Sequence, residues 1–255
     1  MKKYLITAAA TALLTLGTAL PAAADAAPVK SHNIVLVHGA FADASSWDKV
    51  AKILRHKGFH VTEVANPLTS LDDDVAATKA VLDAQDGPTV LVGHSWAGVV
   101  IGEAGDNPKV SALVYIAAFA PDTGETLAAL SANGPTPPGM KAIRPDAKGF
   151  LTVDPGQFPT VFAGDVPPAE AQVMATHQLP LNGAVFTVPA KVAAWHLKPD
   201  YYAVSANDQM IPPDAEAFFA KRMKATTVTL NTSHAAMVSQ PKAVAALIED
   251  AAEAN

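Results

Sequence analysis

The residues with the clearest potential for chemistry lie between positions 89 and 103. Residues 89–92 (TVLV) are apolar or β-branched and predict a buried strand, whereas residues 96–103 have the composition of an apolar helix. Ser95 lies between them, with small residues two positions away on each side. This pattern is typical of the sharp strand-to-helix turn that exposes a nucleophilic hydroxyl. Taken alone, the stretch is also compatible with an ordinary strand–helix turn.

The small residues around Ser95 depart from the usual Gly-x-Ser-x-Gly pattern at one position. Gly93 occupies the first glycine position, but Ala97 occupies the last, and Gly98 follows one residue later. Small side chains are needed because the turn is tight and the helix packs close to the strand. We interpret Ala97 as a tolerated variant, since a single methyl group is compatible with such packing.

A serine hydroxyl is a weak nucleophile until a neighbouring base accepts its proton. Among the eight histidines, His234 follows the last predicted strand and precedes the last predicted helix. In a parallel sheet this loop lies at the same edge as Ser95, so His234 is the predicted base. A loop histidine bonded to the backbone is the alternative. His94 is expected to point away from the chemistry, and His38 to brace the neighbouring loop.

The base needs an acidic partner that fixes its orientation, and Asp208 is the first candidate. It follows the penultimate predicted strand and precedes His234 by 26 positions. Serine, aspartate and histidine then follow one another in the chain order used with this kind of turn. Asp122, after the strand that ends near Phe119, is the second candidate. The alternative for Asp208 is a turn or helix-capping residue.

A tetrahedral intermediate also needs two hydrogen-bond donors for its oxyanion. The backbone N–H of Trp96 is predicted to supply one, and that of Ala40, or alternatively Phe41, the other. Each such donor lowers the barrier by roughly 3–4 kcal/mol. Phe41, Phe119 and Met237 are candidates for an apolar substrate-binding wall. Core packing is the alternative for each of them.

The elements that must position these residues alternate along the chain between strand and helix. Six apolar runs predict strands, and the helical patterns between them indicate a mostly parallel sheet with helices on both faces. The predicted strands are residues 33–38, 59–65, 89–92, 110–119, 201–205 and 226–230. Between about 121 and 199 the alternation breaks, and 12 of the 20 prolines lie there. We interpret this stretch as a small cap or lid insertion over the sheet, to which Phe150, Phe158 and Phe162 could add apolar walls.

The N-terminus predicts export from the cytoplasm. Two lysines precede an apolar run from Leu5 to Leu20, and small residues follow. Residues 1–24 are therefore predicted to be a signal peptide, cleaved after Ala24 or Ala26, and residues 25–255 the mature domain. The expected location is the periplasm or the medium. No cysteine follows the apolar run, so a lipid anchor is not expected.

Composition excludes several classes of function. The formal net charge of the 255 residues is −6, which argues against nucleic acid or anionic lipid as a partner. The chain contains 0 cysteines, which excludes disulfides, thiolate chemistry and sulfur-ligated metals. No stable membrane anchor is expected, because the apolar run at the N-terminus has the length and flanks of a signal peptide.

Together these motifs resemble those of α/β-hydrolase-fold serine hydrolases, in the small carboxylesterase branch that includes plant methylesterases and hydroxynitrile lyases. The resemblance spans roughly residues 33–250 and rests on residues 38–41 (HGAF), 93–98 (GHSWAG), 207–208 (ND) with 211–213 (IPP), and 233–234 (SH). The chain also resembles a group of bacterial α/β-fold hydrolases, through Trp195, residues 198–199 (KP) and residues 234–241. The resemblance implies triad roles for Ser95, Asp208 and His234, and oxyanion roles for Ala40 and Trp96.

The same resemblance narrows the chemistry. Dehalogenases and epoxide hydrolases of this fold use an aspartate nucleophile, which Ser95 excludes. Hydroxynitrile lyases rely on a lysine near the catalytic histidine, and residues 235–237 (AAM) contain none. The expected activity is hydrolysis of a small, largely apolar carboxylic ester through an acyl-Ser95 intermediate, without a metal or organic cofactor. Acyl transfer or perhydrolysis at the same residues, and a ligand-binding protein without turnover, are the alternatives.

Overall fold

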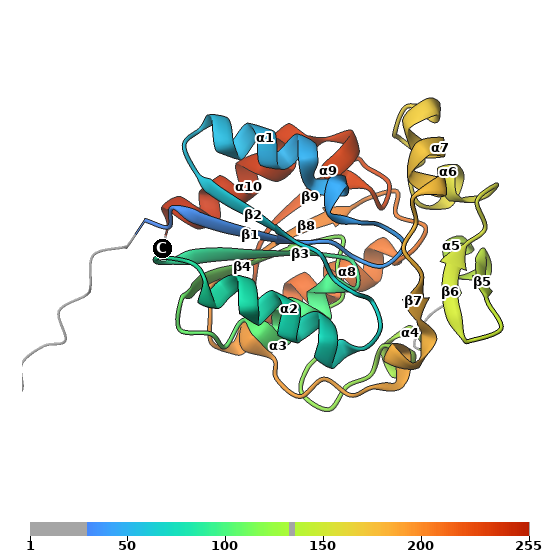
Figure 1. Ribbon diagram of the computed structural model, residues 1–255, viewed down its shortest axis with the longest axis horizontal. Coiled ribbons are helices and arrows are strands. Elements are labelled where there is room, and N and C mark those ends of the chain that lie inside the picture. The colour runs from blue at the N-terminus through green and yellow to red at the C-terminus, as the bar shows by residue number, and fades with distance from the viewer. Residues whose placement is uncertain (1–29, 133–135, 255) are drawn as a thin grey trace, which may run out of the picture.

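The main sheet of the protein consists of six parallel strands. The computed structural model describes residues 30–132 and 136–254 (Figure 1). The strands pair in the order β2-β1-β3-β4-β8-β9. Their bounds are β1 Asn33–Val37, β2 His60–Val64, β3 Thr89–His94, β4 Val110–Ile116, β8 Asp200–Ser205 and β9 Thr226–Leu230. The predicted α/β fold with about six mostly parallel strands is confirmed.

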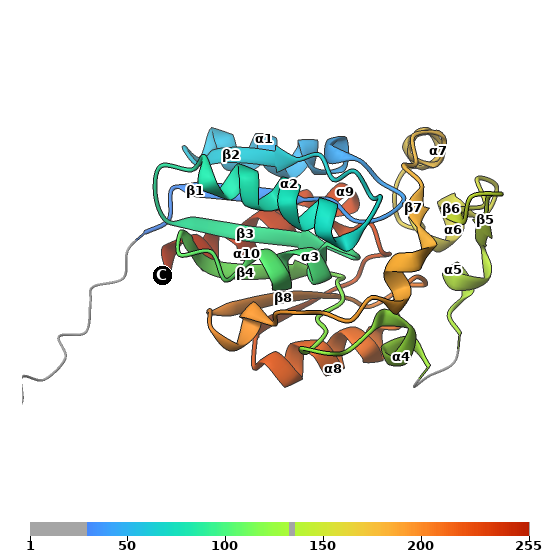
Figure 2. The same cartoon turned by 60° about the horizontal axis from the view of Figure 1, so that its bottom comes forward.

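Helices cover both faces of this sheet, as predicted (Figures 1 and 2). One face carries α1 (Asp48–His56), α9 (Ala236–Ser239) and α10 (Pro241–Glu253). The other carries α2 (Leu71–Asp83), α3 (Ala97–Ala104) and α8 (Pro213–Met223). The central strands β1, β3 and β8 are buried along their whole length, because helices cover them on both sides. Their mostly apolar sequences agree with this burial.

The segment between β4 and β8 lies beyond one end of the main sheet, at the right in Figure 1. It holds a small antiparallel sheet in the order β5-β6-β7 and several short helices. The elements are α4 Leu127–Ser131, α5 Pro138–Lys141, β5 Ile143–Pro145, β6 Phe150–Val153, α6 Phe158–Val161, α7 Pro168–Thr176 and β7 Leu181–Asn182. Three further 3₁₀ turns occur in the chain: η1 Ala44–Trp47, η2 Gly183–Thr187 and η3 Ala194–His196. Proline near the start of α5, α6 and α7 fixes where each helix begins.

One predicted boundary was wrong. The strand expected at 110–119 ends at Ile116, because Ala117 has a positive φ of 44° and leaves the extended conformation. The hydroxyl of Tyr202 then receives a hydrogen bond from the N–H of Ala118 (3.1 Å) and donates one to the carbonyl of the same residue. These bonds satisfy the backbone N–H and carbonyl of Ala118 where the strand ends.

The predicted signal peptide at residues 1–24 lies outside the described residues. Within residues 30–132 and 136–254, no helix has the length and apolar character needed to cross a bilayer.

Candidate active site

Ser95 lies at the turn between β3 and α3 in a strained backbone conformation. Its φ is 54°, in the left-handed region that non-glycine residues rarely adopt. Two glycines make room for the turn. A Cβ atom on Gly39 would lie 2.8 Å from the Cβ of Ser95, and one on Gly93 would lie 2.8 Å from the carbonyl oxygen of Ala97. Neither position therefore tolerates a side chain without displacement of the turn.

The structure also explains the alanine at position 97. Ala97 is fully buried at the start of α3. The closest approach of this helix to its surroundings comes one residue later, where a Cβ on Gly98 would lie 1.9 Å from the carbonyl oxygen of Phe119. The strict requirement for glycine therefore falls on Gly98, and Ala97 has room for its methyl group.

Three polar side chains form a chain of hydrogen bonds at this turn. His234 Nε2 lies 2.9 Å from Ser95 Oγ, and His234 Nδ1 lies 2.5 Å from Asp208 Oδ2. The other carboxylate oxygen of Asp208 accepts hydrogen bonds from the backbone N–H groups of Met210 (2.6 Å) and Ile211 (2.9 Å). Only 7% of Ser95 and 1% of His234 is exposed, so water screens these interactions little.

The loops after three strands bring these residues together. Ser95 follows β3, Asp208 follows β8 and His234 follows β9. The N–H of Asn207 donates to the carbonyl of Thr232 (3.0 Å), which ties the Asp208 loop to the His234 loop. The sequence predicted this meeting because the carboxyl ends of parallel strands share one edge of a sheet. Asp122, the second candidate for the acid, instead pairs with the half-exposed His196, with Nε2 and Oδ1 3.0 Å apart.

His94 was expected to point away from the chemistry, and this expectation was wrong. Its ring packs against that of His234, with centroids 4.6 Å apart, and its Nε2 lies 2.9 Å from the carbonyl oxygen of His234. Because that partner is an acceptor, Nε2 carries the ring proton. Burial, and secondarily the neighbouring His234, lowers the pKa of His94 well below its usual value. A neutral His94 therefore holds the backbone of His234 in place.

Two phenylalanines of the inserted segment also support His234. Phe162 meets its ring edge-on at a centroid distance of 4.8 Å, and Phe158 stacks on Phe162 at 4.5 Å. Both are fully buried, and neither lines the cavity beside Ser95. Their expected place in an apolar pocket wall is therefore corrected. They form a packed layer behind the histidine.

A third buried carboxyl group lies behind Asp208. Glu216 of α8 is fully buried, and its Oε2 accepts a hydrogen bond from the N–H of Ser205 (2.9 Å). Burial and the charge of Asp208 raise the pKa of Glu216 well above its usual value. The protonated form of Glu216 is therefore favoured. Sequence analysis missed it, because only the packing of α8 on β8 shows that this glutamate faces inward.

The loop after β1 presents backbone N–H groups near Ser95. Within residues 30–132 and 136–254, none of the N–H groups of Ala40, Phe41 and Trp96 donates to another protein group. Phe41 has a positive φ of 61°, so its loop is held in a strained shape. His38 braces this loop, as predicted: its Nδ1 lies 2.9 Å from the carbonyl oxygen of Gly39, and its Nε2 accepts from the N–H of Asn66 (3.0 Å). Burial lowers the pKa of His38, which favours this neutral tautomer.

A cavity of about 30 Å³ lies beside Ser95. Phe41 and Phe119 line it as expected, whereas Met237 does not, because Met237 is fully buried in α9. Most of its other walls were not predicted from the sequence. The complete set of other walls is Ala40, Trp96, Leu127, Met140, Ile143, Leu181, Phe186, Met210 and Ile211. The cavity is therefore almost entirely apolar, and more than half of its walls come from the inserted segment and the loop after β8.

A buried aspartate fixes one wall of this cavity. The indole Nε1 of Trp96 donates to Asp74 Oδ2 (2.7 Å), and the N–H of Leu68 donates to Asp74 Oδ1 (2.8 Å). Burial raises the pKa of Asp74. These bonds hold the Trp96 ring in one position next to the serine. In the part of the chain that the structure describes, no group of three His, Asp or Glu side chains is arranged to ligate a metal ion.

A serine at a strained strand–helix turn, bonded to a histidine–aspartate pair at the edge of a parallel sheet, is the arrangement of α/β-fold hydrolases. The sequence agrees with this class. A profile of the alpha/beta hydrolase family matches residues 34–247, and the chain belongs to this family.

Its relatives include esterases. A pyrethroid hydrolase of Sphingobium wenxiniae is 28% identical over 253 residues, covering 87% of this chain and 88% of the relative. Methylesterase 2 of Arabidopsis thaliana is 32% identical over 110 residues, but the match covers only 42% of that enzyme and 37% of this chain. The crystal structure of a pyrethroid hydrolase from Sphingobium faniae superposes with a TM-score of 0.74 at 25% identity, over 87% of this chain and 97% of that one.

Proposed function

We propose that the protein is a serine esterase that hydrolyses a carboxylic ester through an acyl-Ser95 intermediate. The observation that carries the proposal is the 2.9 Å contact between His234 Nε2 and Ser95 Oγ, continued to Asp208. The unpaired N–H groups of Ala40 and Trp96 add the electrostatic component, since they are free to bind an oxyanion.

In the first half of the reaction, Ser95 Oγ attacks the ester carbonyl carbon while His234 Nε2 accepts the hydroxyl proton. Asp208 stabilises the imidazolium and keeps Nδ1 protonated. The negative charge on the carbonyl oxygen is held by the N–H groups of Ala40 and Trp96. When the intermediate collapses, the carbon–oxygen bond to the alcohol breaks. The alcohol leaves with the proton from His234, and the acyl group remains on Ser95.

In the second half, water replaces the alcohol. His234 Nε2 accepts a proton from the water as its oxygen attacks the acyl carbon, and the same two N–H groups hold the oxyanion. Collapse breaks the bond to Ser95 Oγ, which takes the proton back from His234. The acid leaves and the serine is restored, so one water is consumed for each ester.

The walls of the cavity beside Ser95 support an apolar ester as the substrate. Phe41 and Phe119 are two of its aromatic walls, and no charged side chain lines it. The relatives that hydrolyse pyrethroids or methyl esters support ester chemistry. Small-molecule esters are therefore the proposed partners, and no nucleic acid or membrane anchor forms part of the proposal.

Export also remains part of the proposal. The basic and apolar N-terminal sequence supports a signal peptide at residues 1–24, with residues 25–255 as the mature hydrolase and residues 121–199 as its cap. N-terminal sequencing of the protein recovered from the periplasm or medium tests this. A mature chain that begins at Asp25 or Ala27 is expected, and an intact Met1 in those fractions would contradict it.

A fluorophosphonate probe tests the serine mechanism directly. We expect the probe to label the wild-type protein at Ser95 and to abolish hydrolysis of a nitrophenyl ester. Ser95→Ala should lose labelling and about six orders of magnitude in kcat, because the nucleophile is gone. Ser131→Ala, at an exposed serine at the end of α4, is the matched control and should keep both.

Folded wild-type protein that takes up no probe would refute the enzyme mechanism and leave the ligand-binding alternative. Product analysis with an added alcohol or peroxide separates hydrolysis from acyl transfer and perhydrolysis. We expect the free acid to be the main product.

A further inference from the structure

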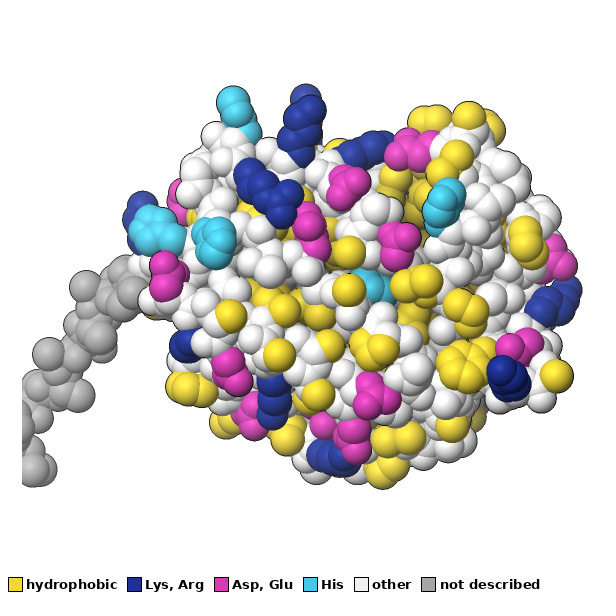
Figure 3. All heavy atoms as spheres, in the orientation of Figure 1, with side chains coloured by type: hydrophobic (Ala, Val, Ile, Leu, Met, Phe, Trp, Pro, Cys, Tyr) yellow, Lys and Arg dark blue, Asp and Glu magenta, His cyan; other side chains and the backbone are white. Residues whose placement is uncertain are grey.

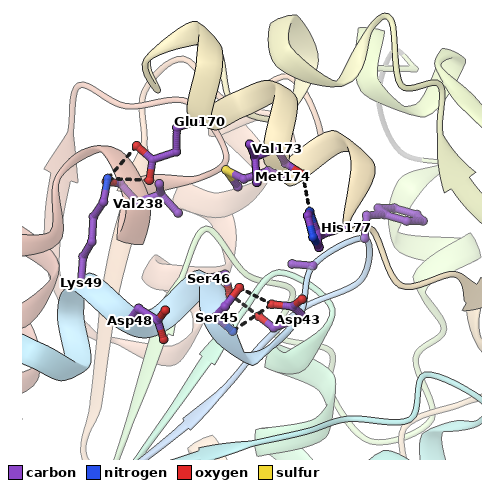
Figure 4. A pocket seen from close by; sticks show the side chains of 12 residues that line it. Asp43, Ser45, Ser46, Asp48, Lys49, Glu170, Val173, Met174, His177 and Val238 are labelled. Carbon is purple, nitrogen blue, oxygen red and sulfur yellow. Dashed lines mark hydrogen bonds and ion pairs between the residues drawn. The ribbon is translucent and has the colours of Figure 1, made fainter.

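A second and much larger hollow lies next to the cavity at Ser95. It has a volume of about 450 Å³ and lies between η1 and α1 on one side and α7 on the other (Figure 4). We call it the α7 groove. The first side contributes Asp43, Ser45, Ser46, Asp48 and Lys49, and α7 with the residue after it contributes Glu170, Val173, Met174 and His177. Phe41, Ala42 and Val238 complete the lining.

An ion pair at one end of the groove holds its two sides together. Lys49 Nζ lies 2.7 and 2.8 Å from the two carboxylate oxygens of Glu170, and 3.2 Å from the carbonyl oxygen of Val238 (Figure 4). In Figure 3 hydrophobic side chains lie within the hollow, and charged side chains lie at its rim. Val173 is 57% exposed there, a high value for a large apolar side chain. The groove therefore has an open, partly apolar interior that none of the described residues fills.

The groove and the cavity share the loop after β1 as a partition. Phe41 lines both, whereas Ala40 faces only the cavity and Ala42 only the groove. Val238, on the groove side, lies four residues after His234 in the same segment. The cavity instead lies on the side of the loops after β4 and β8, where Phe119 and Met210 line it. The two hollows thus meet at Phe41, in the loop that carries one of the proposed oxyanion N–H groups.

The two halves of an ester have different requirements at such a site. The alcohol oxygen must receive the proton held on His234 Nε2, so the alcohol leaves on the histidine side. The acyl group then points toward the other side. The cavity, at about 30 Å³, is the smaller of the two and suits a short acyl chain. The groove, at about 450 Å³, is in the size range of sites for drug-sized ligands.

We propose that the α7 groove binds the alcohol portion of the ester, and that this portion is a bulky apolar alcohol without negative charge. The inference rests on the serine-esterase function proposed above. Lys49 is neutralised by Glu170, which leaves the carboxylates of Asp43 and Asp48 on the rim. These charges repel an anionic alcohol and accept a neutral or cationic one. The substrate is therefore a short-chain acyl ester of a large alcohol.

Val173→Trp tests the groove by filling it. We compare kcat/KM for 2-naphthyl acetate with that for methyl acetate, which have the same acyl group. The ratio is expected to fall at least tenfold in this variant, mainly through KM for the naphthyl ester. Leu197→Trp, at a 69% exposed leucine that lines neither hollow, is the matched control and should keep the wild-type ratio.

Asp48→Asn tests the charge of the rim. The ratio of kcat/KM for 4-sulfophenyl acetate over phenyl acetate should rise at least threefold in this variant, and the rise should shrink at high salt. An unchanged naphthyl-to-methyl ratio in Val173→Trp, or an equal loss on both esters, would overturn the assignment of the groove. Wild-type protein that hydrolyses neither ester and takes up no fluorophosphonate would instead refute the serine-esterase function itself.

Discussion

At the residue scale, the site depends on a buried carboxylate, Asp208, with a second buried carboxyl group, Glu216, behind it. Asp208 faces His234 with one oxygen and two backbone N–H groups with the other. Glu216, buried behind it, has a raised pKa because of burial and the charge of Asp208. Two ionised carboxylates so close together would repel each other. We infer that Glu216 is a positioning residue that acts in its protonated form.

Glu216→Gln and Glu216→Ala test this role. The glutamine side chain is neutral, has nearly the same shape and can still accept from the N–H of Ser205, so kcat at neutral pH should stay within about threefold. Alanine leaves that N–H unpaired, which should reduce the free energy of unfolding by about 1–3 kcal/mol. Ester hydrolysis and urea unfolding measure the two effects.

The pH profile separates positioning from plain packing. In the wild type, ionisation of Glu216 at alkaline pH should disturb Asp208 and reduce kcat, and Glu216→Gln should lack this alkaline fall. A glutamine variant as inactive as the alanine variant at neutral pH would show that the ionisable carboxyl is itself required.

Sequence analysis could predict Ser95, Asp208 and His234 because each follows an apolar run that forms a strand. It could not find Asp74 or Glu216, since both lie on helices whose inward faces are set by packing with distant residues. His94 was misjudged for the same kind of reason. The direction of its side chain depends on the path of the loop after β9, which lies 140 residues further along the chain.

At the scale of elements, the close packing of α3 on the loop after β4 sets the position of the nucleophile turn. Gly98→Ala tests this contact, because the new Cβ would lie 1.9 Å from the carbonyl oxygen of Phe119. The Cβ is held rigidly by the backbone of α3, and the carbonyl oxygen belongs to the backbone after β4, so the helix must move. We expect a loss of about 1–3 kcal/mol in the free energy of unfolding, together with reduced kcat, as Ser95 shifts with the helix.

Gly102→Ala is the matched control in the same helix. The nearest atoms to its new Cβ lie 3.9 Å away, so no displacement is needed. Alanine is favoured over glycine in a helix by about 1 kcal/mol, and this variant should be as stable as the wild type or more so. Equal unfolding midpoints for the two variants would show that the contact at Gly98 is unimportant.

The inserted segment shows where sequence patterns stop being informative. Its strands have two to four residues each, too few for a period-two pattern to stand out. Three of its helices, α5, α6 and α7, have a proline in the first turn, and prolines equally well indicate loops. The pairing of these short strands joins residues far apart in the chain, such as Phe150 and Asn182. Most walls of the cavity beside Ser95 could therefore not be predicted, whereas Phe41 and Phe119, at the ends of main-sheet strands, could.

At the scale of the whole molecule, burial of acidic groups links stability to pH. Asp200 begins β8, at the end of the sheet opposite to Ser95, and is only 8% exposed. Its Oδ1 has no hydrogen-bond partner among the described residues. Burial raises the pKa of Asp200 to about 8. This carboxyl group therefore opposes folding whenever it is ionised.

The sign of the effect on stability follows from the upward shift of the pKa of Asp200. A carboxyl whose pKa is higher in the folded than in the unfolded state stabilises the fold fully below its unfolded pKa, and this stabilisation is lost as pH rises toward 8. Asp200→Asn removes the ionisable group. The variant should therefore gain about 2–4 kcal/mol in free energy of unfolding relative to the wild type between pH 5 and pH 9.

Urea unfolding of both proteins at pH 5, 7 and 9 measures this gain. Asp250→Asn, at an exposed carboxyl near the end of α10, is the control and should keep a constant difference from the wild type across the range. A constant difference for Asp200→Asn as well would mean that Asp200 ionises equally readily in both states. Because the measurement follows global unfolding, it tests burial at the amino end of β8 independently of the chemistry at Ser95.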